Sequence, residues 1–300
     1  MKLYLAGIYA ANFGKESNLY RRLTDDEKKQ RDAVQYHLES YHYIYRQSFV
    51  DKIRRDKVKI FLDSGAFSAF TKGVDVDLKA YCQYIKENED IIEVASVLDG
   101  IGDPLKTWQN QQEMERLGTR PLPCFHYGED ERYLEWYIAN YEYITLGGMV
   151  PISTPQLRIW LDRIWGTYLV DGSGRPKVKV HGFGLTTLEL MERYPWFSVD
   201  SSSWVQIART GGLMLPRGKL VSISRHSPQR KVANQHLDSL PEALSAPVIT
   251  ELIGYGCDVE RAREIYLARW AFNCWSYSEI NKLYNSHTST YQKKQEGLFE

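Results

Sequence analysis

The sequence of 300 residues has few cysteines, no long apolar run and no excess of charge of either sign. Cys82, Cys124, Cys257 and Cys274 lie far apart and form no CxxC pair, so neither a zinc finger nor a disulfide framework is predicted. No run approaches the roughly 18 apolar residues of a membrane-spanning helix. The apolar residues 3–11 are expected to form a first buried strand rather than a secretory signal. We therefore expect a cytoplasmic protein with no membrane partner.

Charge is balanced over the whole chain but not along it. The 38 lysines and arginines offset 38 aspartates and glutamates, which excludes bulk attraction to a polyanion. Residues 201–237 nevertheless contain no acidic residue and six basic ones: Arg209, Arg217, Lys219, Arg225, Arg230 and Lys231. If the partner is a nucleic acid, we expect this segment, with Ser202 and Trp204, to contact it. The alternative interpretation is a solvated basic loop.

Short apolar runs alternate with amphipathic or charged stretches along the chain. The eight runs span residues 2–8, 58–62, 91–98, 121–125, 143–146, 177–180, 197–199 and 219–223. Continuous apolar strands separated by helices are typical of a buried parallel sheet, and eight repeats fit a closed (β/α)₈ barrel of the TIM type. We therefore predict an α/β fold with a (β/α)₈ barrel over residues 1–240. Residues 241–300 are expected to add C-terminal helices that pack on the barrel.

A long helix is predicted after the first strand. Residues 24–27, Thr-Asp-Asp-Glu, match a capping box at its start. A stripe with spacings of four and three follows: Val34, Leu38, Tyr41, Tyr45 and Phe49. Such spacing is typical of one helix face, so we expect this stripe to pack against the core.

Polar residues follow the predicted strands at their C-terminal ends, where the active sites of such barrels lie. Asp63, Asp99 and Asp200 each follow a different run, and His126 and His181 follow two more. Each residue alone has a structural explanation, as a helix cap, a turn residue or a hydrogen-bonded buried histidine. Capping does not require three aspartates to face one mouth, so we interpret this rim as a functional site.

Several carboxylates in one pocket can divide the work of a displacement reaction. One attacks an electrophilic carbon, another transfers protons, and a third holds the N–H donors of a planar ligand. Nearby aromatic residues offer stacking surface, and glycines allow close backbone approach. The set is compatible with displacement at a sugar carbon that bears a base. No HxH or HExxH pattern is present, so no metal site is predicted.

The strand-end motifs resemble those of the tRNA-guanine transglycosylases, which are (β/α)₈ barrels that exchange guanine for a 7-deazaguanine base. Residues 63–67, Asp-Ser-Gly-Ala-Phe, resemble the family's Asp-Ser-Gly-Gly-aromatic motif. Five further motifs follow in the family's order: Asp99, His126-Tyr127-Gly128, Gly147-Gly148-Met149, His181-Gly182-Phe183-Gly184 and Asp200. Of the six, the first is the most specific.

The resemblance implies a role for each motif. Asp200 would form a covalent bond to C1′ of the nucleoside, and Asp63 would act as general acid and base. Phe67 would stack on the ring, while Asp99 and Gly148, with His126, would recognise the purine edge. The implied base-binding set is Phe67, Asp99, His126, Gly147, Gly148, Met149, His181 and Gly182.

Departures from the family favour DNA over tRNA as the substrate. The CxCxxC…His cluster that holds a structural zinc ion in the tRNA enzymes is absent, the chain is shorter, and His126 replaces the usual glutamine. The sequence is in these respects similar to the DNA-modifying branch of the superfamily, in its compact phage-encoded form. The resemblance implies two partners, DNA with a single-stranded or flipped-out guanine and a free 7-deazaguanine base. No cofactor is predicted. Zinc stays open, although the cluster that binds it in the tRNA enzymes is absent.

Three alternatives stay open at this stage. The same chemistry on tRNA is the nearest. A barrel glycoside hydrolase with two carboxylates is a second enzyme class. A non-catalytic nucleic-acid-binding protein is the third alternative. The sequence predicts no oligomeric state.

Overall fold

The fold is built on one parallel sheet, seen in a computed structural model that describes residues 1–185, 187–285 and 290–292. Its eight strands are ordered β4-β3-β2-β1-β8-β7-β6-β5. Their bounds are β1 Lys2–Ala6, β2 His37–Ser40, β3 Ile60–Asp63, β4 Ile92–Ala95, β5 Cys124–His126, β6 Tyr143–Gly147, β7 Lys179–Gly182 and β8 Ser198–Ser201. The parallel alternation of strands and helices confirms the α/β class expected from the sequence.

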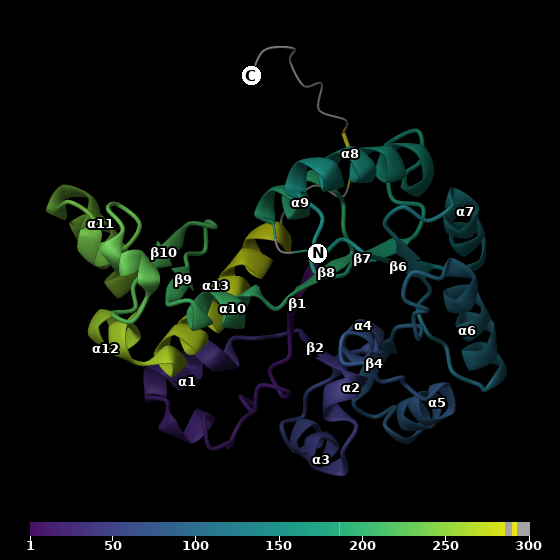
Figure 1. Ribbon diagram of the computed structural model, residues 1–300, viewed down its shortest axis with the longest axis horizontal. Coiled ribbons are helices and arrows are strands. Elements are labelled where there is room, and N and C mark those ends of the chain that lie inside the picture. The colour runs from purple at the N-terminus through teal and green to yellow at the C-terminus, as the bar shows by residue number, and fades with distance from the viewer. Residues whose placement is uncertain (186, 286–289, 293–300) are drawn as a thin grey trace.

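Helices surround the curled sheet, with α3 to α8 along one side of the view in Figure 1. Those before the last strand are α1 Asp25–Asp32, α2 Tyr41–Ile44, α3 Gln47–Arg55, α4 Ala66–Phe70, α5 Leu78–Glu87, α6 Pro104–Arg116, α7 Glu131–Asn140, α8 Thr154–Ile164 and α9 Leu188–Arg193. The later ones are α10 Ser203–Arg209, α11 Glu242–Gly254, α12 Val259–Glu264 and α13 Tyr266–Asn285.

The two edge strands, β4 and β5, meet at a single point. Ser96 and Leu122 form an isolated parallel bridge just outside these strands. The N–H of Leu122 donates to Ala95 O at 2.8 Å, and the N–H of Val97 donates to Leu122 O at 2.9 Å. In the part of the chain that the structure describes, no strand ladder joins these edges. The sheet is therefore TIM-like and curled, but it is not closed by continuous pairing.

The prediction of one long helix that continues to Phe49 is wrong. The capping box is present, since Thr24 and Glu27 exchange their side-chain hydrogen bonds, but α1 ends at Asp32. His37–Ser40 forms strand β2, which pairs with β1 on one side and β3 on the other. Leu38 lies in β2, Tyr41 in α2 and Phe49 in α3, whereas Val34 and Tyr45 lie in connecting residues and Tyr45 is exposed. Pairing with two neighbouring strands outweighs a local helical spacing.

The eighth predicted strand lies outside the parallel sheet. β10 (Leu220–Ser222) pairs antiparallel with β9 (Gly212–Met214) in a hairpin. Leu213 and Val221 of this hairpin share a second hydrophobic cluster with residues of α11 and α12, such as Leu252 and Val259. The hairpin, α11 and α12 lie together at one side of the molecule (Figure 1). The division at residue 240 stays a prediction.

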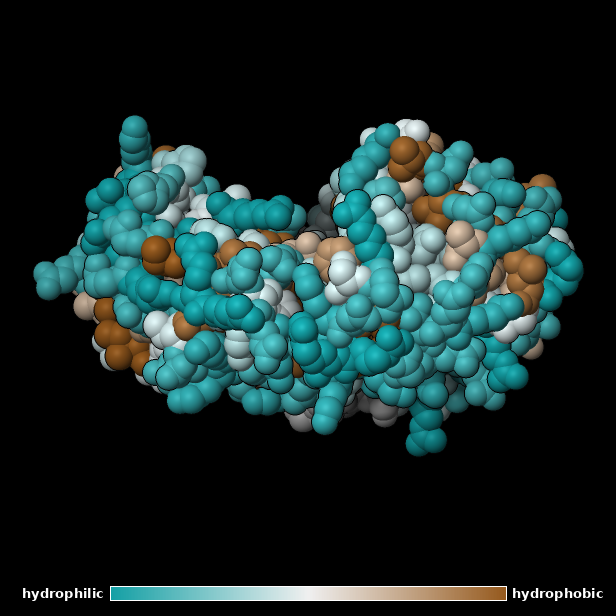
Figure 2. Space-filling model, turned by 90° about the horizontal axis from the view of Figure 1, so that it is seen from below, coloured by the Kyte–Doolittle hydropathy of each residue, from teal (hydrophilic) through white to brown (hydrophobic). Residues whose placement is uncertain are grey.

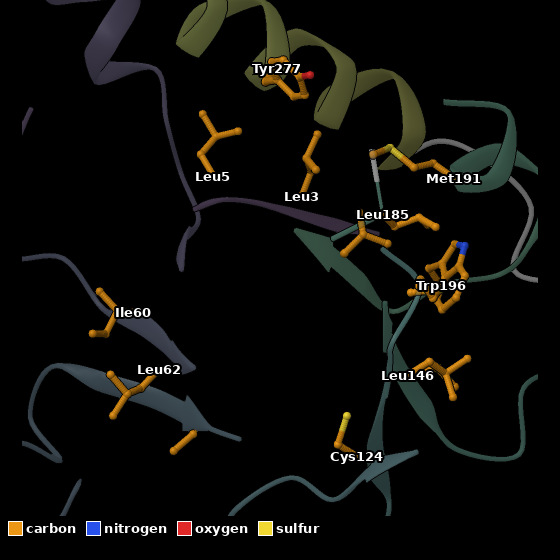
Figure 3. Packing of buried hydrophobic residues seen from close by; sticks show 14 of the residues in the cluster. Leu3, Leu5, Ile60, Leu62, Cys124, Leu146, Leu185, Met191, Trp196 and Tyr277 are labelled. Carbon is orange, nitrogen blue, oxygen red and sulfur yellow. The ribbon is translucent and has the colours of Figure 1, made fainter. Parts of the chain in front are cut away.

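The main core fills the space between the sheet and its helices. Leu3 and Leu5 of β1 point toward Tyr277 of α13 (Figure 3), and the N–H of Leu3 donates to Asn281 Oδ1 at 2.8 Å. Because side chains alternate along a strand, Tyr4 points to the other face. There it packs with Leu38 and Phe61 in a small cluster inside the curl of the sheet. The same alternation directs Asp63, two residues after Phe61, into the interior at the end of β3.

The surface is mainly hydrophilic on the face in Figure 2, with small apolar patches and a dip between two raised parts of the outline. Among the described residues, no helix has both the length and the apolar composition required to cross a membrane.

Candidate functional site

Three carboxylates meet at the C-terminal end of the sheet. Asp63 ends β3, Asp200 lies in β8, and Asp99 follows β4. Burial, followed by the charges of Asp99 and Asp200, raises the pKa of Asp63 to about 7. The N–H of Gly65 donates to Asp63 Oδ2 at 3.1 Å and opposes this rise. A carboxyl group with such a pKa can both give and accept a proton at neutral pH.

Asp200 is held in place by the backbone of the preceding loop. Its Oδ1 accepts a hydrogen bond of 2.8 Å from the N–H of Gly184. The Nε2 atom of His181 lies 3.5 Å from the same oxygen, and its Nδ1 atom lies 2.7 Å from Ser198 Oγ. Burial lowers the pKa of His181, so its imidazole is neutral at neutral pH. His181 therefore faces Asp200 as a neutral side chain and supplies no positive charge there.

His126 lies between two carboxylates at the end of β5. Its Nδ1 atom is 2.8 Å from Glu129 Oε1, and its backbone N–H donates to Glu129 Oε2 at 2.9 Å. On the other side, Nε2 is 3.4 Å from Asp99 Oδ1 and 3.4 Å from Cys124 Sγ. Cys124 and His126 are two residues apart on one strand, so their side chains share a face.

The protonation of this cluster departs from that of the free side chains. Burial lowers the pKa of His126, but Cys124 and Asp99 raise it by more, and the net direction is upward. Burial raises the pKa of the Cys124 thiol to about 11. Ligand atoms of Asp99, Cys124 and His126 all lie within 4.8 Å of one another, which makes these residues a possible set of metal ligands.

Gly147 and Gly148 leave room for this cluster. A Cβ atom on Gly147 would lie 2.9 Å from both Cys124 Sγ and His126 Cδ2. Gly148 has a φ of +67° and is exposed at the mouth. Met149, by contrast, is only 2% exposed and belongs to the main core, so it offers no stacking surface in this structure.

Phe67 is the exposed aromatic residue nearest to the acidic motif in sequence. It lies on α4, which begins directly after Gly65, and 62% of its surface is exposed. Phe183 contacts Phe61 and His181, with ring centroids 5.7 and 4.6 Å apart. Phe67 is thus free to contact a ligand, whereas Phe183 is partly used in packing.

Two residues of the predicted set lie elsewhere. A Cβ atom on Gly182 would meet the Trp196 ring at 3.0 Å, so Gly182 faces the core behind the sheet rather than the site. Trp204 is fully buried, and its indole N–H donates to Ala6 O at 2.9 Å. It stacks on Phe13 with ring centroids 6.1 Å apart. Its large apolar ring is used in the core, which corrects the expectation of a nucleic-acid contact.

The basic segment is only partly free. Arg225 is paired with Glu260 and Glu264 at 2.7 and 2.6 Å, and Arg230 lies 3.4 Å from Asp238. The structure exposes the other basic side chains, Arg209, Arg217, Lys219 and Lys231, and also Ser202.

The turn of the β9–β10 hairpin lies near the mouth of the sheet. A Cβ atom on Gly218 would meet the Leu188 side chain at 2.3 Å, so this turn packs against the start of α9. The loop before α9 contains Gly184, which binds Asp200. Arg217 and Lys219 flank Gly218 and therefore lie on the same side of the molecule as the carboxylates.

A cavity of about 870 Å³ lies at the opposite end of the sheet. Lys2, Lys179 and Phe197 line it, and these residues lie at the N-terminal ends of β1, β7 and β8. Because active sites of this architecture lie at the C-terminal ends of the strands, we assign the site to the carboxylates and not to this cavity.

The chain matches no model of a known protein family, and no curated protein is significantly similar to it. The likeness to the transglycosylases rests on the motifs alone.

Sequence reasoning missed two residues of the site and one buried carboxyl group outside it. Cys124 and Glu129 contact His126, and the pattern Cys-x-His-x-x-Glu at the end of a strand could have indicated them. Glu39 is fully buried in β2 and accepts hydrogen bonds from the N–H groups of Tyr9 and Ala10. Burial raises the pKa of Glu39 to about 8. It was hidden because β2 was interpreted as helix.

Proposed function

We propose that this protein is a DNA-guanine transglycosylase that exchanges guanine in DNA for a 7-deazaguanine derivative through a covalent aspartyl-sugar intermediate. The observation that carries the proposal is the position of Asp63, Asp99 and Asp200 at the C-terminal ends of β3, β4 and β8, where the charges of Asp99 and Asp200 act on Asp63. The proposal includes a (β/α)₈ barrel as the catalytic fold, and the curled, TIM-like parallel sheet supports it.

The carboxylates have separate tasks in this reaction. A carboxylate oxygen of Asp200 attacks C1′ of the deoxyribose as the bond from C1′ to the guanine N9 breaks. Asp63, protonated, donates its proton to the leaving base. Asp63 then accepts the N9 proton of the incoming 7-deazaguanine, whose nitrogen attacks C1′ and releases Asp200. The pKa of about 7 suits Asp63 to both proton transfers.

The purine would lie between the acids and the exposed ring of Phe67. Asp99 offers carboxylate oxygens to N–H donors on the edge of the base, and the exposed backbone of Gly148 lies at the same mouth. His126 contacts Asp99 and thereby fixes its orientation. Arg217 and Lys219 are placed to bind phosphates beside the opening. Because a stacked base cannot reach this depth, the guanine would have to be flipped out or single-stranded.

Exchange of radiolabelled guanine into DNA tests the proposal. We expect Asp200→Asn to reduce exchange by at least about a thousandfold, since the covalent step needs its carboxylate. Asp90→Asn, an exposed aspartate paired with Arg54, is the matched control and should exchange normally. Normal exchange by Asp200→Asn would contradict the mechanism.

Offering DNA and tRNA to the same preparation decides between the two substrates. Mass analysis of the nucleosides after incubation with candidate 7-deazaguanines should show the modified nucleoside in DNA. If the modified nucleoside appears only in tRNA, the protein carries out the same chemistry on tRNA instead of DNA. Release of a free sugar from a carbohydrate would instead favour the glycoside hydrolase.

A further inference from the structure

We infer that Asp99, Cys124 and His126 form a binding site for a divalent transition metal ion, with Zn²⁺ as the ion that fits best. The inference goes beyond the proposed function, because no step of the base exchange requires a metal. It rests on the geometry of the three side chains, on Glu129 behind them, and on one carboxylate oxygen without a hydrogen-bond partner.

Two of the three separations between the ligand atoms match the edges of a zinc tetrahedron. Zinc bonds of about 2.0–2.1 Å to nitrogen or oxygen and about 2.3 Å to sulfur place neighbouring ligand atoms about 3.4–3.6 Å apart. His126 Nε2 lies 3.4 Å from Cys124 Sγ and 3.4 Å from Asp99 Oδ1. All three atoms lie within 4.8 Å of one another. An ion can therefore be accommodated with small side-chain rotations.

Glu129 prepares His126 for this role. A carboxylate that accepts a hydrogen bond from the distal ring nitrogen is the usual partner of a metal-binding histidine. Glu129 Oε1 lies 2.8 Å from Nδ1, and Glu129 Oε2 also accepts the backbone N–H of His126. When the Nδ1 proton is directed to Glu129 and a metal ion displaces the proton of Nε2, the freed lone pair of Nε2 points at Asp99 and Cys124.

Asp99 contributes an oxygen that lacks a proper donor. Its Oδ1 atom is buried, and among the described residues it has no hydrogen bond, only the 3.4 Å approach of His126. Buried polar atoms without partners are rare and call for an explanation such as an absent ion. The mixed donor set of sulfur, nitrogen and oxygen selects zinc and related transition metals over Mg²⁺ or Ca²⁺.

The three protein ligands leave one corner of a zinc tetrahedron free. The side chains of His126 and Asp99 are 20% and 16% exposed, although Asp99 Oδ1 and Cys124 are buried. A zinc site with three protein ligands keeps the free corner for water or for a donor atom of a bound molecule. The site is therefore of the ligand-binding kind, unlike the closed four-ligand zinc clusters of purely structural sites.

Metal binding can be measured directly on the full chain. After removal of metal with a chelator, equilibrium dialysis against Zn²⁺ should give one bound equivalent. Loading with Co²⁺ should give a sulfur-to-metal charge-transfer absorption band, because Cys124 is a ligand. Cys124→Ala should remove the band and weaken Zn²⁺ binding at least about 100-fold. Cys82→Ala is the matched control, since Cys82 is also a buried free cysteine but lies outside the cluster.

Two further variants keep the test valid if Cys124→Ala fails to fold. Asp99→Asn preserves the side-chain shape and should also weaken binding at least about 100-fold. Glu129→Gln should weaken it about 10–100-fold through His126. Binding by Asp99→Asn equal to that of the unaltered chain, or a Co²⁺ complex without the sulfur band, would overturn the inference.

The outcome is separable from that of the proposed function, because dialysis and absorption do not depend on base exchange. Zn²⁺ binding without base exchange would support the metal site and contradict the proposed function. Base exchange by a chain that binds no Zn²⁺ would support the proposed function and contradict the metal site.

Discussion

Asp63 makes the stability of the fold depend on pH. Its pKa is about 7 in the folded chain, against an ordinary value of 3.8, because it is buried beside Asp99 and Asp200. Between these two pH values the folded state holds a proton that the unfolded state has released. The free energy of unfolding therefore falls as the pH rises through this window and stays low above it.

We expect Asp63→Asn to abolish this part of the pH dependence. A shift of about three pKa units corresponds to at most about 4 kcal/mol, so the variant should gain stability over the unaltered chain at pH 8 and little at pH 4. Urea unfolding at both pH values measures the difference. Asp90→Asn serves as the control, and Glu39, with its pKa of about 8, leaves a residual pH dependence in every variant. An equal loss of stability between pH 4 and pH 8 in the unaltered chain and in Asp63→Asn would contradict the expectation.

Single residues show what the sequence could and could not predict about the site. Placement at strand ends predicted that Asp63, Asp99 and Asp200 would lie at one end of the sheet, and the bounds of β3, β4 and β8 put them there. Their joint role in a reaction stays a prediction. The burial of Trp204 was not predictable, because a tryptophan near a basic segment serves equally well in the core. The contact of Cys124 with His126 depends on strand alternation, which a three-residue strand reveals only weakly.

Among the elements, β2 shows why the fold was predicted only in part. Seven of the eight runs fall on strands of the parallel sheet, because apolar runs of this length are typical of buried strands. β2 has only four residues, of which Glu39 is a buried carboxylic acid. Its identity as a strand comes from pairing with β1 and β3, and such pairing leaves no local pattern.

The turn between β3 and α4 depends on Gly65. Its φ is +75°, and a Cβ atom there would lie 2.3 Å from Ser40 Oγ and 2.6 Å from His42 Cβ. Since Gly65 also donates its N–H to Asp63, we expect Gly65→Ala to lower the free energy of unfolding by about 1–3 kcal/mol and to reduce base exchange. Thermal unfolding and the exchange assay measure the two effects.

Gly73→Ala is the matched control for this turn. Gly73 also has a positive φ, +66°, but a Cβ atom there would meet nothing within 4 Å. It should lose stability through backbone strain alone and keep its exchange activity. Full activity of Gly65→Ala would show that the turn does not position Asp63.

At the scale of the whole molecule, the balance of charge hides an uneven distribution. Arg225 and Arg230 are paired with acidic residues that follow residue 237, which reduces the positive charge of the segment. Arg217 and Lys219 stay exposed at the hairpin turn. The surface available to phosphates is thus smaller than the sequence indicated, and it is confined to one side.

Charge reversal tests this surface. We expect Arg209→Glu with Arg217→Glu to weaken DNA binding and to reduce the slope of its salt dependence by about one for each phosphate contact that is lost. Arg132→Glu, on α7 at the far side of the molecule in Figure 1, is the matched control. Titrations at several salt concentrations measure both quantities. An unchanged slope would contradict a role of this surface in DNA binding.

The bridge between Ser96 and Leu122 links the rigidity of the scaffold to the state of its site. Among the described residues, backbone pairing joins the edges of the sheet at this bridge, and separation of the edges there breaks the two backbone hydrogen bonds of Leu122. Beyond it, Asp99 on one edge approaches His126 on the other. A base or an ion that binds both residues would connect the two edges. Its binding would then stabilise the folded sheet by an amount that increases with ligand concentration.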